Sequence, residues 1–204
     1  MDPIVAAVGG GAGLLGAALA HVLTVLCDRA GSEEWLRGPY GPQFFNVALY
    51  TGVFYGAIGW AAARRLRGLA VGFAGSFLGI LVPMFVLTRY GGWGMPRTAD
   101  AVTLQWKIAV LVVYIAAIWG SIAGIGAVCA RSTRLRGALE AVGGSLAGYA
   151  VLTLALKLAP GLTSGHWNPT SFLPPPVNLL DGLLSGAGLC LALSLDDKLP
   201  RRNP

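Results

Sequence analysis

Six long apolar segments occupy most of this 204-residue chain. Crossing the hydrocarbon of a bilayer takes roughly twenty apolar residues in a helix. A helix bonds its backbone polar groups internally, as hydrocarbon requires, and the short alternating segments of a membrane β-barrel are absent from the sequence. The sequence therefore predicts an all-α integral membrane protein, a six-transmembrane helical bundle forming one domain over residues 1–204. The expected spans cover residues 4–26, 45–63, 69–87, 108–130, 138–156 and 177–195.

Composition supports this interpretation, because 55% hydrophobic and 12% charged residues do not fit a soluble core. The first apolar segment begins near the N-terminus and must be compared with a signal peptide. No Lys or Arg precedes it, it is longer than a signal core, and Leu26 is a poor cleavage residue. We therefore expect it to be retained as a membrane span.

Basic residues gather on one side of the expected bundle. Nine of the fifteen Lys and Arg residues follow the second, fourth and sixth spans. Short positively charged loops resist translocation, so we expect both termini in the cytoplasm of a bacterial-type inner (plasma) membrane. The net charge of +6 then indicates contact with anionic lipid headgroups and no nucleic acid. The predicted cytoplasmic basic turns contain Arg64, Arg65, Arg67, Arg131, Arg134 and Arg136.

Two parts of the sequence resemble each other. Residues 65–68 read Arg-Leu-Arg-Gly, and residues 134–137 repeat this motif 69 residues later. In the same register, the glycine-rich residues 75–79 align with residues 144–148. We interpret the second and third spans as a two-helix hairpin repeated in the fourth and fifth, related by a pseudo-twofold along the membrane normal. The alternative is chance recurrence of arginine-capped turns and glycine-rich helices.

Glycines recur at a spacing of about one helical turn in several of the spans, including the first, third, fifth and sixth. Small residues on one helix face allow close backbone approach, so these faces are expected to be helix–helix contacts and not a pore lining. Ser76 and Ser145 could hydrogen-bond across such contacts. The predicted packing residues are Gly75, Gly79, Gly144, Gly148, Gly182 and Gly186.

Four polar residues fall in or beside the spans on the expected outer side: His21, Lys157, Asn178 and Asp181. An ionisable group in hydrocarbon costs on the order of 3 kcal/mol, so each is a candidate site. One interpretation is a proton, ion or solute site built from these four residues. The other, which we favour, is a snorkelling Lys157 that forms an ion pair with Asp181 and locks two helices together.

The expected outer connections are longer than the inner turns, and long connections often carry binding surfaces. Ser32 could cap a short interfacial helix in the first of them. Tryptophans favour the membrane interface, so we expect those of the outer connections to anchor the outer rim. They are Trp35, Trp93, Trp106 and Trp167.

No set of nucleophile, base and orienting residue is visible, and no metal-ligand cluster or phosphate-binding loop. We therefore expect no enzyme activity and no cofactor. The favoured function is a non-catalytic polytopic inner-membrane subunit. It would pack through its glycine faces against other membrane subunits or its own copies and present its outer loops to a partner. The alternative is a small transporter or channel for an ion or small solute, with its site near the outer side of the bundle.

Overall fold

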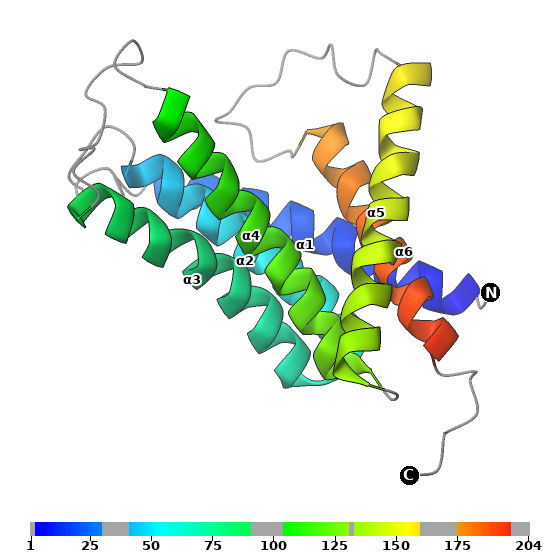
Figure 1. The fold of residues 1–204 in the computed structure, drawn as a ribbon. Coiled ribbons are helices and arrows are strands. Elements are labelled where there is room, and N and C mark those ends of the chain that lie inside the picture. Colours follow the sequence, from blue (N-terminus) through cyan, green and yellow to red (C-terminus); the bar gives the residue numbers. More distant parts are fainter. Residues whose placement is uncertain (1–2, 30–40, 91–103, 131–132, 160–174, 197–204) are drawn as a thin grey trace.

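The computed structural model describes residues 3–29, 41–90, 104–130, 133–159 and 175–196, and these residues contain helices and no strand. The all-helical prediction is therefore confirmed for this part of the chain. Each predicted apolar segment coincides with one helix, apart from Ala130 at the end of the fourth. The helices are α1 (Pro3–Arg29), α2 (Gly41–Ala63), α3 (Leu66–Tyr90), α4 (Leu104–Cys129), α5 (Arg134–Leu158) and α6 (Pro176–Asp196) (Figure 1).

Five helices are long and apolar enough to cross a membrane, namely α1, α3, α4, α5 and α6. They are compatible with a multi-pass membrane protein. The exception is α2, which carries Asn46, Tyr50, Thr51 and Tyr55. It packs between α1 and α3 and also contacts α4 and α6, and Thr51 and Tyr55 are buried. These buried polar side chains therefore have protein neighbours in place of lipid.

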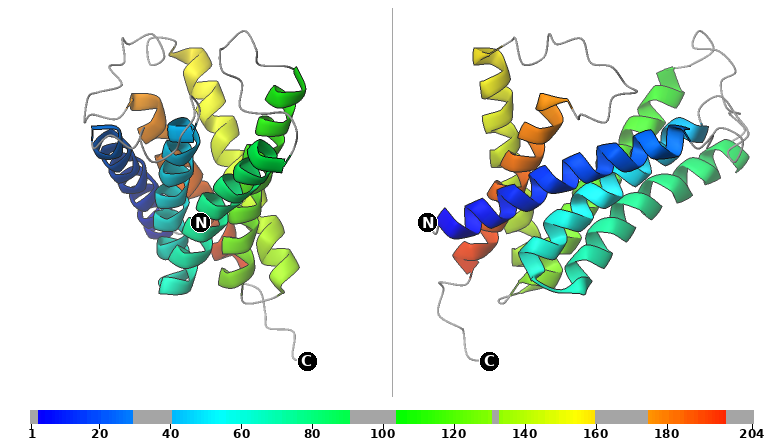
Figure 2. Two further views of the ribbon diagram at one scale, coloured as in Figure 1. Left: turned by 90° about the vertical axis from the view of Figure 1, so that its left-hand side faces the viewer. Right: turned by 180° about the vertical axis from the view of Figure 1, so that it is seen from behind.

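The helices pack in a closed ring. Each helix contacts its neighbours in the chain, and α1 packs against α6 to complete the ring. Phe54 and Ile58 of α2, Ile125 of α4 and Leu189 of α6 form the centre of the larger core cluster. Figure 2 shows that the helices lie close together at one end and fan apart toward the other.

A second core cluster joins α2, α3 and α4 through Ala48, Ile80, Met84 and Trp106. Trp106 is only 4% exposed, so the prediction that it anchors the outer rim is wrong. Its indole packs into this cluster at the start of α4, where neighbouring helices cover it. The other three tryptophans of the outer connections, and the capped helix expected at Ser32, lie outside the described residues.

Glycines lie where the helix backbones approach most closely. A Cβ on Gly144 would clash with the Gly188 carbonyl oxygen, and one on Gly148 with that of Leu184, so both glycines face α6. In the α3–α4 interface, a Cβ on Gly75 would lie 2.7 Å from the Ser121 hydroxyl oxygen. There Ser76 Oγ donates to Ser121 Oγ at 2.9 Å.

The remaining predicted glycine face, on α6, meets α1. Gly182 lies against the backbone of Gly13, and Gly186 against that of Gly9. These glycines are therefore in contact within the chain itself. By contrast, Gly11, Gly120 and Gly143 have no atom near enough to meet an added Cβ.

Candidate functional site

Two groups of residues could carry function, and they lie toward opposite ends of the bundle. One is built around Asp181 on α6 and includes the candidates from the sequence. The other is a cavity at the arginine end, which we define as the end where α2 turns into α3 at Arg64 and Arg65.

Asp181 lies half-buried in the second turn of α6. Ser185, one turn further along the same helix, donates its hydroxyl to Asp181 Oδ1 at 2.8 Å. Asn178 is half-buried in the first turn of α6, and His21 is 4% exposed on α1. α6 therefore carries a polar face, made of Asn178, Asp181 and Ser185, that neighbouring helices partly shield.

The predicted ion pair between Lys157 and Asp181 does not form. Lys157 is exposed in the last turn of α5, and no salt bridge joins these two described side chains. Asp181 instead lies on α6, which contacts α2, the helix that carries Tyr50 and Tyr55. Matching depth along two helices did not place the two groups on facing surfaces.

Tyr50 and Tyr55 were missed in the sequence, although both lie in a helix that also carries Asn46 and Thr51. Tyr55 is 9% exposed and packs edge-on against Phe54, which also stacks on Tyr50. The Asp181 carboxylate and the Ser185 hydroxyl combine a negative charge with a hydroxyl dipole. Such a group can hold a proton or a small cation.

Asn46 lies one helical turn before Tyr50 on the same face of α2. Its Nδ2 donates to the carboxylate of Asp28 on α1, and its Oδ1 is buried without a hydrogen-bond partner in the described structure. A buried acceptor without a partner is costly. Asn46 thus extends the polar surface of α2 from Tyr50 toward the end of the bundle opposite the arginine end.

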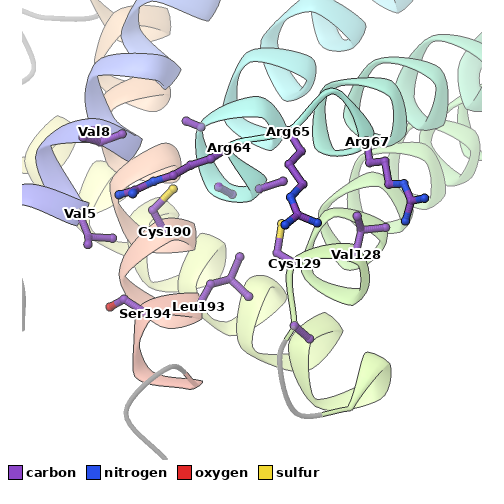
Figure 3. Close-up of a pocket in the computed structure, with 14 residues that line it drawn as sticks. Val5, Val8, Arg64, Arg65, Arg67, Val128, Cys129, Cys190, Leu193 and Ser194 are labelled. Atoms are coloured by element: carbon purple, nitrogen blue, oxygen red, sulfur yellow. The ribbon is translucent and has the colours of Figure 1, made fainter.

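The second site is a cavity of about 440 Å³ at the arginine end. Three cationic side chains come from the α2–α3 turn, Arg64 and Arg65, and from the first turn of α3, Arg67. α1, α4 and α6 supply mostly apolar walls and two thiols (Figure 3). These walls include Val5 and Val8 of α1, Val128 and Cys129 of α4, and Cys190, Leu193 and Ser194 of α6.

Arg64 has a left-handed backbone conformation, with φ of 51°. Its N–H donates to the Trp60 carbonyl oxygen at 2.7 Å and closes the C-terminus of α2. Glycine usually occupies this capping position, because other residues lose roughly 1–2 kcal/mol there. Figure 3 shows the Arg64 side chain extending between α1 and α6 toward Cys190, while Arg65 lies near Cys129.

The charges in this cavity are not balanced by its lining. No carboxylate is among the described residues that line it, and Arg64, Arg65 and Arg67 form no salt bridge with a described acidic residue. In the second hairpin, Arg136 pairs with Glu140 at 2.7 Å, and neither Arg134 nor Arg136 lines the cavity. The two similar motifs therefore have different surroundings.

Comparisons with protein-family models, curated proteins and solved structures found no match. Functional inference therefore depends on the geometry of the two sites. Among the described residues, no three His, Cys, Asp or Glu side chains gather as metal ligands. His166, the second histidine of the chain, and Arg131 lie outside the described part.

Proposed function

We propose that the chain is a small membrane transporter or channel for an ion or small solute, with Asp181 as its proton- or cation-binding group. The observation that carries this proposal is the position of Asp181, which is half-buried in an apolar helix. Its carboxylate accepts a hydrogen bond from the Ser185 hydroxyl, and no salt bridge joins it to a described cation. Ionisable groups inside membranes are expensive, and those found there commonly bind or relay ions.

The packing of the glycines favours this proposal over a partner-dependent subunit. The subunit interpretation needs glycine faces that are free to meet another protein. Gly75 and Gly79 instead face α4, the pair on α5 faces α6, and the pair on α6 faces α1. Outward-facing positions such as Leu111, Val112 and Leu146 carry larger apolar side chains suited to lipid contact.

We further propose that all six helices cross the bilayer, with the arginine end in the cytoplasm. α2 is the helix in question, because the other five are the ones long and apolar enough to cross a membrane. Its contacts with α1, α3, α4 and α6 give its polar side chains protein neighbours in place of lipid. The basic turns support the orientation, since clustered arginines favour the cytoplasmic side.

The hairpin repeat stays a proposal, supported by one shared contact. Gly68, which ends the first Arg-Leu-Arg-Gly motif, packs against Gly59 of α2. Gly137, which ends the second, packs against Gly126 of α4 in the same way. Both hairpins thus cross at their motif glycine, although only the first motif lines the cavity.

Flux measurements on Asp181→Asn test the proposed function. The full chain, reconstituted into vesicles, should conduct protons or sodium ions down an imposed gradient, followed with a pH-sensitive or sodium-sensitive dye inside the vesicles. Removing the charge should reduce that flux at least about tenfold, the factor that corresponds to roughly 1.4 kcal/mol of lost binding. Asp28→Asn is the matched control, since Asp28 is exposed at the end of α1 and bonded to Asn46.

The control should retain flux within about twofold of the unmodified chain, a change under about 0.5 kcal/mol. Both variants should elute from size-exclusion chromatography as the unmodified chain does. Unchanged flux through a correctly folded Asp181→Asn protein would remove the basis for the proposal. So would the absence of any proton or sodium flux through the unmodified chain.

A further inference from the structure

We infer that the cavity at the arginine end binds a ligand that carries a phosphoryl group. The cavity includes Cys190, nine residues after Asp181 on α6, which places it about 14 Å further along the helix at 1.5 Å per residue. The buried side chains of Phe54, Ile58 and Leu189 belong to the core between these two levels. The inference thus concerns a separate site and does not depend on the proposed role of Asp181.

Charge is the first argument. Three guanidinium groups from four consecutive residues, 64–67, border one cavity whose described lining contains no carboxylate. Guanidinium groups form paired hydrogen bonds with phosphate oxygens, which makes arginine the preferred residue for phosphate recognition. A phosphoryl group carries negative charge on a tetrahedral set of oxygens and can therefore accept hydrogen bonds from more than one guanidinium at once.

The backbone at Arg64 is the second argument. Its left-handed conformation is unfavourable for any residue with a Cβ, and glycine would cap the end of α2 at a lower conformational cost. Conformations of this kind persist where the surrounding structure holds them, and they are concentrated at functional sites. Here the conformation accompanies a cationic side chain that extends from the turn into the space between α1 and α6 (Figure 3).

The size and walls of the cavity indicate the rest of the ligand. Its volume of about 440 Å³ lies in the usual range of small-molecule sites, roughly 300–1,000 Å³. Val5, Val8 and Leu193 provide apolar wall beside the arginines. A phosphoryl group attached to an apolar or organic portion would therefore use more of the site than phosphate alone. Such a group can come from an anionic lipid or from a soluble phosphorylated compound.

The second Arg-Leu-Arg-Gly motif supplies a matched control. Arg134 occupies the same motif position as Arg65 and is exposed, but it does not line the cavity. Arg65→Gln and Arg134→Gln therefore remove the same charge from equivalent motif positions. Only the first should affect a ligand bound in the cavity.

The experiment measures thermal unfolding of the full chain purified in a neutral detergent. Phosphatidylglycerol, phosphatidylcholine and inorganic phosphate are titrated separately, with chloride at matched ionic strength as the salt control. Phosphatidylglycerol or inorganic phosphate should raise the melting temperature in a saturable way, whereas phosphatidylcholine and chloride should not. Stabilisation by the lipid alone identifies a headgroup site, and stabilisation by phosphate identifies a site open to soluble ligands.

Arg64→Gln and Arg65→Gln should each raise the half-saturating concentration of the stabilising probe at least about tenfold, as expected when a charge-assisted hydrogen bond is lost. Arg134→Gln should leave it within about twofold. The inference would be overturned if the rise in melting temperature survived both cavity substitutions, or if Arg134→Gln weakened probe binding equally. Either result would show general attraction of the probe to basic turns. No response to either probe would also overturn the inference.

Cysteine labelling gives an independent readout if a cavity variant does not fold. Cys129 lines the cavity and is half-buried, while Cys27 lies near the end of α1, away from the cavity. In the unmodified chain, the stabilising probe should slow the alkylation of Cys129 at least about threefold, a change that corresponds to under about 1 kcal/mol. The alkylation rate of Cys27 should not change. Equal rates at Cys129 with and without the probe would contradict binding in the cavity.

Discussion

Gly144→Ala should disrupt the bundle, whereas Gly143→Ala, one residue away on the same helix, should leave it intact. A Cβ on Gly144 would clash with the Gly188 carbonyl oxygen and lie 2.6 Å from the Cβ of Ala192, so α5 and α6 would have to separate. Overpacking typically costs 1–3 kcal/mol, and more where backbone blocks relaxation. We expect Gly144→Ala to destabilise the folded chain by about 3 kcal/mol or more.

Gly143 is exposed, and no atom lies within 4 Å of an added Cβ. Alanine is a better helix former than glycine by up to about 1 kcal/mol, so Gly143→Ala should be neutral or slightly stabilising. Thermal unfolding of the two purified variants, with size-exclusion chromatography, measures the difference. If both glycines tolerate alanine equally, the close α5–α6 contact is wrong.

The second large effect is an all-or-none difference in labelling between two native cysteines. If all six helices cross as proposed, Cys27, near the end of α1, and Cys129, at the end of α4, lie on opposite sides of the membrane. If α2 did not cross, the intervening helices would bring both to the same side. A membrane-impermeant maleimide applied to intact cells should therefore label Cys27, and applied to inverted vesicles it should label Cys129.

Cys27→Ser and Cys129→Ser variants assign each signal to its residue. Cys190 is 4% exposed and should react slowly from either side. Labelling of both thiols from one face would show that α2 does not cross. Labelling on opposite faces but with the two sides exchanged would retain six crossings and reverse the proposed orientation.

The helical segments could be predicted because a membrane helix satisfies its backbone hydrogen bonds alone. Apolar length is therefore a local property, and the segments agree closely with the helices. α2 shows where this reasoning weakens. Its polar side chains, among them Tyr50 and Thr51, reduce its apparent suitability for lipid, and only its position between α1 and α3 shows that protein surrounds it.

The candidate site depended on which helix faces meet, and there the sequence was less informative. Lys157 and Asp181 have similar expected depths, yet the first is exposed and the second is half-buried beside Ser185. α6 also contacts α2, more than one hundred residues earlier in the chain. Which side chains face each other depends on how the helices rotate about their axes, which residue spacing does not specify.

Sequence alone was sufficient for the helical class, the apolar segments and the small-residue faces, because each follows from the chemistry of one segment in its solvent. The tertiary structure decided which partner each glycine face meets, that Trp106 is buried, and that one of two similar arginine motifs borders a cavity while the other does not. These properties arise from packing between segments distant in the chain. Identical short motifs can therefore acquire different electrostatic surroundings once the bundle closes.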